Sequence, residues 1–285
     1  MAAEVLCCLA PVSGGTYVDA TLGLGGHAAS ILEASAPAGR VIGFEWDVQA
    51  MAFARHRLAA YGDRVVFVNR SYADLDPVLS GLAVGRIDGI VVDLGVSSLQ
   101  LDKGERGFSF RVDAPLDMRM DLQQDVDAAT LLARATEEEL ADIFYHFGEE
   151  RQARRIAAHI CETRRKQPVV TTRQLASLVA EAVPKRFHPN RIHVATRVFQ
   201  ALRIAVNREL ENLHSLLGAA PRWLRPGACF CAIAFHSLED RMVKQAFRRD
   251  DRLEQLNRKP IRPAAEEVRE NPRARSALLR CARRC

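Results

Sequence analysis

The chain has 285 residues, of which 48% are hydrophobic and 26% are charged, and its formal net charge is +5. This length suffices for one large domain with an insertion, or for two domains. No apolar run approaches the roughly 18 residues of a membrane span, and Met1–Pro11 lacks a signal-peptide pattern, so we expect a soluble protein. The seven cysteines are an odd number without a Cys-x-x-Cys pair, which favours a reducing compartment and argues against a structural zinc site.

The first hundred residues begin with a strand, a glycine-rich turn and a helix. Tyr17–Thr21 has the β-branched and aromatic character of a strand, Gly23 to Gly26 allow a sharp turn, and residues 27–36 can continue as a helix. Residues 40–45 form a second predicted strand, and a carboxylate about 20 residues beyond such glycines is where ribose hydroxyls bind. The pattern, closed by Glu45, predicts a nucleotide cofactor site.

The class of cofactor depends on Asp19. With Ala28 in the last position, the turn also fits the G-x-G-x-x-A motif of nicotinamide enzymes, and an ordinary strand-to-helix turn is a third reading. An acid four residues before Gly23 would repel a pyrophosphate, which needs a bare helix N-terminus. The same acid can hold the ammonium of a methionine moiety, directly or through water. The residues therefore favour S-adenosylmethionine (AdoMet).

Strands and helices continue to alternate up to about residue 100. A helix is expected over 48–60 with Asp47 as its N-cap, and strands are expected over 65–69 and 87–94. The last of these is apolar almost throughout, which suits a buried parallel position. This order predicts an α/β fold with a doubly wound sheet.

Beyond residue 100 the alternation stops. Residues 100–121 are rich in Gly, Asp, Arg and Pro and predict a long ordered loop of the kind usually reserved for function. Helices follow: a capping box at Thr136 opens one that ends at Gly148, a basic one spans about 149–166, and Thr172 can cap another. We therefore expect an inserted all-helical domain at 101–194, between core parts at 1–100 and 195–285.

The second core part is expected to complete the sheet. An amphipathic helix is predicted over 196–217, and a core strand over 228–235. Ser237-x-x-Asp240 then predicts a capping box for the next helix, with a structural role for Ser237.

Positive charge is concentrated in two places. Residues 241–285 hold 14 Lys and Arg against 6 Asp and Glu, so we expect a basic C-terminal tail. The second cluster lies on the helix predicted over 149–166 and comprises Arg151, Arg154, Arg155, Arg164, Arg165 and Lys166. A solvated helix face would explain either cluster alone, whereas both together favour a phosphate-rich partner.

Several long motifs resemble one known family. They are Glu105–Phe110, Pro115–Asp121, Thr196–Arg203, Phe235–Arg241 and Asn271–Ser276. Together they resemble the ribosomal RNA small subunit methyltransferase H family, also called MraW, over nearly the whole chain. The resemblance implies a Rossmann-like class I methyltransferase sheet with an inserted helical substrate-recognition domain. It also implies AdoMet-dependent methylation of the exocyclic N4 of a cytidine in the decoding region of small-subunit ribosomal RNA.

The resemblance also assigns site residues by motif. Gly25, Gly26 and His27 would line the methionine end of AdoMet, Glu45 would bind the ribose hydroxyls and Tyr72 would lie against the adenine, while Asp93 and Gln100 would close the site. Each residue also has an interpretation without a functional role: Glu45 as a solvent-facing acid, Tyr72 as a loop aromatic that covers the core, and Asp93 as part of a strand-terminating turn. Expected substrate contacts are Arg119, Arg197, Arg203, His236, Arg241, Arg273 and Arg275.

Three departures from the family pattern stand out. The usual opening His-x-Pro-Val-Leu-Leu is not found, so a piece of the cofactor lid is expected to be missing. Glu45-Trp-Asp-Val48 replaces Asp-Arg-Asp-Pro, and Leu24 stands where an arginine is usual. Glu in place of Asp keeps the carboxylate, so we expect the ribose contact to remain.

The amino nitrogen of cytosine is a weak nucleophile, because its lone pair is shared with the ring. By analogy with amino-methylating DNA enzymes, we expect Asp93 or a carbonyl of the segment 93–98 to polarise it. No metal is expected, because AdoMet carries a good leaving group and no His/Cys/carboxylate cluster has ligand spacing in the sequence.

Two other classes of protein are alternatives. A nicotinamide oxidoreductase is disfavoured by Asp19, and an RNA-binding assembly factor with a vestigial pocket would be revealed by loss of AdoMet binding.

The expected partner is small-subunit ribosomal RNA within an assembled small subunit, and no membrane partner is expected. A homodimer is left open. The expected location is a bacterial cytoplasm, with an organelle matrix as the alternative.

Overall fold

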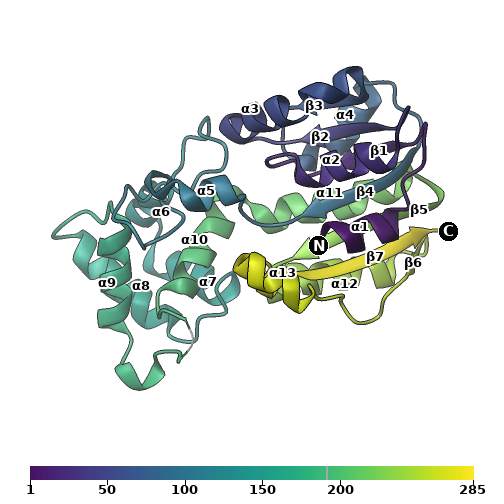
Figure 1. Ribbon diagram of the computed structural model, residues 1–285. Coiled ribbons are helices and arrows are strands. Elements are labelled where there is room, and N and C mark those ends of the chain that lie inside the picture. The colour runs from purple at the N-terminus through teal and green to yellow at the C-terminus, as the bar shows by residue number, and fades with distance from the viewer. Residues whose placement is uncertain (191) are drawn as a thin grey trace. The chain divides into compact units, whose positions relative to one another are not determined.

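A computed structural model describes residues 1–190 and 192–285, apart from the side chain of Ser98. The chain divides into two compact units (Figure 1). The first comprises Met1–Gly95 and Leu210–Cys285, and the second comprises Val96–Glu209. Among the described residues, no helix is both long enough and apolar enough to cross a membrane.

The first unit is built on one seven-stranded sheet with the order β3-β2-β1-β4-β5-β7-β6. The strands are β1 (Thr16–Asp19), β2 (Arg40–Phe44), β3 (Val65–Val68), β4 (Ile87–Asp93), β5 (Leu224–Ala234), β6 (Leu253–Gln255) and β7 (Leu278–Arg284). The first five run parallel, and β7 lies antiparallel between β5 and β6. Parallel strands bring their carboxyl ends to one edge, where open sheets of this kind bind ligands.

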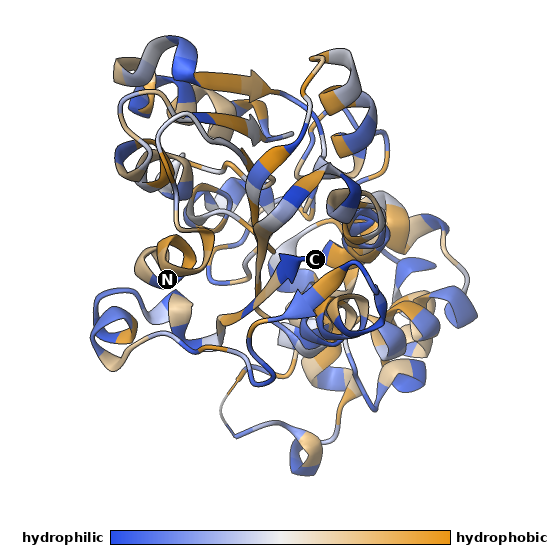
Figure 2. Cartoon of the chain, turned by 90° about the vertical axis from the view of Figure 1, so that its right-hand side faces the viewer, coloured by the Kyte–Doolittle hydropathy of each residue, from blue (hydrophilic) through white to orange (hydrophobic). Residues whose placement is uncertain are grey.

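Helices cover both faces of this sheet. One apolar cluster holds buried residues of α1 (Ala2–Leu9), α2 (Gly26–Ala34) and α3 (Val48–Arg57), and the other holds those of α4 (Leu75–Gly81), α11 (Glu209–Trp223) and α12 (Ser237–Arg249). Successive strand residues alternate between the two clusters, because side chains alternate across a strand. Figure 2 shows that the helices of the chain carry both hydrophilic and hydrophobic residues. The remaining short helices of this unit are η1 (Ala59–Arg64), η2 (Tyr72–Asp74), α13 (Ala265–Glu270) and η5 (Pro272–Ser276).

The described residues of the second unit form helices and long loops around a separate apolar core. Its elements are α5 (Ser98–Asp102), η3 (Gly104–Arg106), α6 (Ala128–Arg134), α7 (Glu137–His146), α8 (Ala153–Arg164), α9 (Thr172–Ala182), η4 (Lys185–Phe187) and α10 (Thr196–Asn207). Leu140, Phe144, Ile156 and Val198 are among its fully buried residues. The doubly wound sheet and the helical insertion predicted from the sequence are thus confirmed.

The structure places the unit boundaries at residues 96 and 209 rather than at 101 and 194. Helix α10, which the sequence grouped with the second core part, belongs to the second unit. The physical reason is its buried face, because Val198, Phe199, Ala201 and Leu202 pack into the helical core.

Three local predictions were wrong by small amounts. The helix predicted over 196–217 is two helices, separated at Arg208, whose φ of 50° is left-handed. The N-cap of α9 is Thr171, which forms a capping box with Gln174, whereas the hydroxyl of Thr172 donates to the carbonyl of Val112. The N-cap of α12 is likewise one residue earlier than expected, His236 instead of Ser237.

The largest correction concerns the C-terminal segment. It is not a tail, because β7 is an interior strand of the sheet and α12 covers one sheet face. Arg280 in β7 is 4% exposed and makes a two-fold ion pair with Asp240 of α12, with N–O distances of 2.7 and 2.9 Å. A buried guanidinium is tolerated here because its partner carboxylate matches its geometry.

Candidate cofactor site

Acidic side chains gather at the carboxyl edge of the sheet. Asp19 is the last residue of β1, Glu45 follows β2, and Asp93 is the last residue of β4. The glycine turn lies between β1 and α2. Gly25 has a φ of +81° and caps α2, and a Cβ there would lie 3.1 Å from Leu58, so the turn requires glycine at this position.

The Glu45 carboxylate is buried and held by the backbone. Its Oε2 accepts a hydrogen bond from the N–H of Gly23 (2.9 Å), and its Oε1 accepts one from the N–H of Asp47 (2.8 Å). Each oxygen keeps a further lone pair for a hydroxyl donor. Asp47 itself caps α3, as predicted, by accepting from the N–H groups of Gln49 and Ala50. Glu45 is therefore a buried carboxylate and not a solvent-facing acid.

A second group of titratable side chains lies beside the turn and consists of Asp19, His27 and Asp93. Asp19 is 1% exposed, and only its Oδ1 has a hydrogen-bond partner among the described residues, the N–H of Thr21 (3.2 Å). The Nε2 of His27 lies 3.6 Å from Oδ2 of Asp93. The other oxygen of Asp93, Oδ1, is buried and also lacks a partner within the described part of the chain. Buried polar atoms of this kind call for an explanation, and a ligand that donates hydrogen bonds supplies one.

Burial dominates the protonation of these groups. It raises the pKa of Asp19 to about 6, against the lowering effect of the His27 charge. It raises the pKa of Glu45 to about 7, against the lowering effect of the hydrogen bond from Asp47. For His27, burial acts to lower the pKa, but the hydrogen bond and charge of Asp93 outweigh it and the pKa is raised. Such perturbed groups in one place are typical of binding sites.

Two residues that shape this edge were missed in the sequence. The hydroxyl of Thr21 accepts a hydrogen bond from the N–H of Asp93 (2.6 Å), which joins the ends of β1 and β4. The side-chain amide of Asn69 donates to the carbonyl of Glu45 (2.7 Å) and joins β3 to β2. Their signal is weak, because a polar residue just after a predicted strand also fits an ordinary loop.

The remaining predicted cofactor residues are placed as follows. Gly26 begins α2 and His27 follows it. Tyr72 is half-buried in η2, after the carboxyl end of β3, and packs against an apolar cluster. Gln100 lies in the second unit, where its side chain forms a capping box with Ser97 at the start of α5. The contacts of Tyr72 and Gln100 with a cofactor therefore stay predictions.

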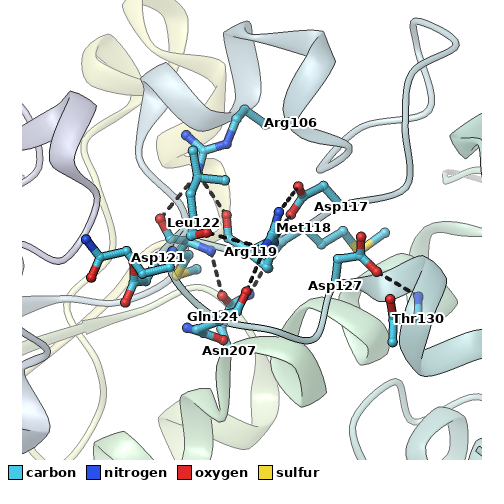
Figure 3. Close-up of polar contacts among 12 residues, drawn as sticks. Arg106, Asp117, Met118, Arg119, Asp121, Leu122, Gln124, Asp127, Thr130 and Asn207 are labelled. Carbon is cyan, nitrogen blue, oxygen red and sulfur yellow. Dashed lines mark hydrogen bonds and ion pairs between the residues drawn. The ribbon is translucent and has the colours of Figure 1, made fainter. Parts of the chain in front are cut away.

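Three of the predicted substrate arginines, Arg119, Arg197 and Arg203, have partners within the second unit. Arg119 makes two 2.8 Å contacts with Asp117 and donates to the carbonyls of Leu122 and Gln124 (Figure 3). Arg203 forms a two-fold ion pair with Glu209. These contacts hold the long loop and the end of α10 in shape.

Hydrogen bonds from two other segments, η3 and α10, also hold this loop. Arg106 donates to the carbonyls of Arg119 and Met120, and Asn207 of α10 bonds to the backbone of Met118 and Met120 (Figure 3). The prediction of an ordered loop is confirmed. Its motif residues do much of the internal hydrogen bonding.

The remaining predicted substrate contacts differ in exposure. Arg273 and Arg275 are exposed on η5, on either side of buried Ala274, and Arg241 is exposed on α12. Arg197 donates to the carbonyl of Glu149 (3.2 Å), and His236 is largely buried as the cap of α12. In the basic cluster of the second unit, Arg151, Arg154, Arg155 and Arg165 are exposed, whereas Lys166 pairs with Glu162.

Three cysteines meet in the first unit, although the sequence shows no ligand spacing. The sulfur atoms of Cys8, Cys231 and Cys281 lie within 4.8 Å of one another. They come from α1, β5 and β7 and are far apart in the chain. Spacing along the chain did not predict this proximity, because it is set by the pairing of β5 with β7 and by the packing of α1 against them.

Several known proteins are similar to this chain. The sequence model of the MraW methylase family matches residues 1–285. A ribosomal RNA small subunit methyltransferase H from Desulfotalea psychrophila is 55% identical over 275 residues, which cover 96% of this chain and 92% of the relative. Its counterpart from Cyanothece sp. is 56% identical over 271 residues, covering 95% and 88%. A solved structure of an rRNA methylase from Streptococcus thermophilus aligns with a TM-score of 0.47 and 10% identity, covering 99% and 94%.

Proposed function

The chain belongs to the MraW methylase family, and on this basis we propose that it methylates the exocyclic N4 of a cytidine in the decoding region of small-subunit ribosomal RNA, with AdoMet as methyl donor. Close relatives that span nearly the full chain support the rRNA substrate, and the Rossmann-like sheet supports the cofactor. One observation carries the proposal further. The carboxyl edge of the sheet presents two buried carboxylate oxygens, on Asp19 and Asp93, without partners in the described chain.

The residues at this edge fit AdoMet. Glu45, buried and oriented by two backbone N–H groups, would accept the ribose hydroxyls. Asp19 would hold the ammonium, because its free oxygen is fully desolvated and a cation would compensate its charge. When bound, AdoMet supplies an electrophilic methyl carbon on a sulfonium. Gly25, Gly26 and His27 would line the methionine end, Tyr72 would lie against the adenine, and Gln100 would help to close the site.

Asp93 is the residue that we assign to the chemistry. Its Oδ2 faces His27 at 3.6 Å, and its Oδ1 is available to accept an amino hydrogen of the cytosine. The N–H of Asp93 is held by Thr21, which fixes the backbone at the end of β4 before the substrate arrives. Accepting that hydrogen bond localises the lone pair on nitrogen, which makes attack on an electrophilic carbon easier. The raised pKa of His27 favours the imidazolium, whose charge faces the second oxygen of Asp93.

RNA binding is assigned to the exposed cations. Arg273, Arg275 and Arg241 lie on the first unit, and the exposed arginines of the basic cluster lie on the second. Arginines pair well with phosphates, and two such clusters suit a folded RNA better than a short strand. The target cytidine must leave its stack to reach the carboxylate of Asp93 at the sheet edge. The second unit would then serve substrate recognition, with His236 and Arg197 as further contacts.

The experiment is methylation of small subunits that lack this modification, followed by nucleoside mass spectrometry of their rRNA. N4-methylcytidine should appear with wild-type protein, and Asp93→Ala should lower turnover about 100-fold at saturating cofactor. Asp63→Ala, which changes an exposed carboxylate of the same unit, is the matched control. Product methylated on carbon 5, or unchanged turnover of Asp93→Ala, would contradict the assignment.

Location and assembly complete the proposal. The relatives are bacterial, and we expect the protein to act in a bacterial cytoplasm on an assembled small subunit. A homodimer is the further arrangement to be tested, by sedimentation with and without RNA.

A further inference from the structure

The cysteine cluster of the first unit has no role in the proposed methyl transfer. Cys8 lies on α1, and Cys231 and Cys281 face each other as directly paired residues of the antiparallel strands β5 and β7. All three pack with the apolar cluster that contains Val5 and Leu9 of α1. The cluster therefore joins the N-terminal helix to the C-terminal strand.

Two of the three sulfur atoms are very close together. The Sγ atoms of Cys8 and Cys281 are 2.7 Å apart, and those of Cys231 and Cys281 are 3.7 Å apart. A disulfide places its sulfur atoms about 2.05 Å apart, so the Cys8–Cys281 pair needs only a small movement to reach bonding distance. Cys281 is thus the natural partner of Cys8.

The three thiols differ in accessibility and charge. Cys231 and Cys281 are 0% and 1% exposed, whereas Cys8 is half-buried and is the most exposed of the three. Hydrogen bonds from Cys231 and then Cys281 lower the pKa of the Cys8 thiol to about 3, despite the opposing effect of burial. The thiolate is the nucleophilic form, and an accessible thiolate beside a second cysteine is the arrangement found in peroxide-sensitive pairs.

We propose that Cys8 is a peroxide-reactive site and that Cys281 resolves it into a disulfide that ties α1 to β7. The Cys8 thiolate attacks one oxygen of hydrogen peroxide and an S–O bond forms as the O–O bond breaks. Cys8 becomes a sulfenic acid, and the second peroxide oxygen leaves as hydroxide. The Cys281 sulfur then attacks the Cys8 sulfur and displaces hydroxide, which takes the Cys281 proton to become water. The sulfur pair loses two electrons and the peroxide gains them.

A metal site is the competing use of the same atoms, and electrostatics disfavours it. Three thiolates around Zn²⁺ carry a net negative charge, and burying that charge in an apolar cluster is costly. The disulfide is neutral and leaves no polar atom without a partner. The apolar surroundings therefore favour oxidation over metal binding.

Mass spectrometry of the peroxide-treated wild-type chain tests the proposal without any variant. Free thiols are alkylated under denaturing conditions after treatment, and trypsin then releases Cys8 in Met1–Arg40 and Cys281 in Cys281–Arg283, apart from Cys285. We expect the mass of the intact chain, measured before alkylation, to fall by two hydrogens. After digestion, these two peptides should be linked. A thiol reductant should reverse both changes.

Variants identify the sulfur that reacts. Cys8→Ser should lose the cross-link, and the matched control Cys7→Ser, which changes the exposed neighbour on the same peptide, should keep it. Cys281→Ala should leave a Cys8 sulfenic acid that dimedone traps. A cross-link that persists in Cys8→Ser would overturn the proposal. So would stoichiometric zinc uptake by the reduced protein, lost in Cys8→Ser, with no cross-link on peroxide treatment.

Discussion

Replacing Asp19 by Asn separates the stability of the ligand-free protein from its affinity for AdoMet. Asn has nearly the same shape, and its carbonyl oxygen can keep the hydrogen bond from the N–H of Thr21. The change removes a buried negative charge whose Oδ2 has no partner among the described residues. We expect the variant to be more stable at neutral pH and to bind AdoMet poorly.

The magnitude follows from the pKa of Asp19. Burial raises this pKa from the ordinary 3.8 to about 6, so the folded protein holds the proton more tightly than the unfolded chain does. Stability from this group is therefore fully present below pH 3.8 and falls as the pH rises toward 6. Above pH 6 the full cost of ionising Asp19 is about 3 kcal/mol, and at pH 5 it is about half of that. Asn has no such cost.

Urea denaturation at pH 5 and pH 8 measures the effect. Asp19→Asn should gain stability over wild type at both values, and about 1.5 kcal/mol more at pH 8 than at pH 5. Isothermal calorimetry should show AdoMet binding weakened about tenfold to 100-fold, from the loss of a charge-assisted hydrogen bond. The control, Asp63→Asn, should change neither quantity. A destabilised Asp19→Asn variant that binds AdoMet as wild type does would refute the reasoning.

Three further predictions rest on other residues. Glu45→Ala should weaken AdoMet binding about tenfold or more. Wild-type binding should also weaken as the pH falls through about 7, where Glu45 takes up a proton. Calorimetry that shows unchanged affinity in the variant and at low pH would count against the ribose contact. Replacing Arg273 and Arg275 by Ala should weaken RNA binding and flatten its log–log salt dependence by up to about 0.9 for each lost phosphate contact, whereas Arg269→Ala, which removes an exposed arginine paired with Glu266, should leave the slope nearly unchanged. Arg280→Met should cost about 3 kcal/mol in urea denaturation, because it leaves the half-buried carboxylate of Asp240 without its partner, and the double variant with Asp240→Asn should recover part of that loss.

Much of the first unit could be predicted from short patterns. The strands β1 to β4 and the N-cap of α3 lie within a residue or two of their predicted positions, because apolar runs and capping side chains act on neighbouring residues. Strand β7 could not be predicted in this way. Its sequence Leu-Leu-Arg-Cys-Ala-Arg-Arg carries three arginines, which is typical of a solvated segment. Partners that are distant in the chain, Asp240 and the carbonyl of Arg258, make Arg280 compatible with the interior.

The same division runs through the candidate site. The sequence by itself determined the glycine turn, the carboxylate that follows β2 and the acid at the end of β1, since each is set by its own strand and turn. Only the tertiary structure decided that Asp19, His27 and Asp93 meet, that Arg119 serves its own loop, and that Cys8 touches Cys281. These contacts join residues from separate elements, and the order of strands in the sheet, not spacing along the chain, sets which of them become neighbours.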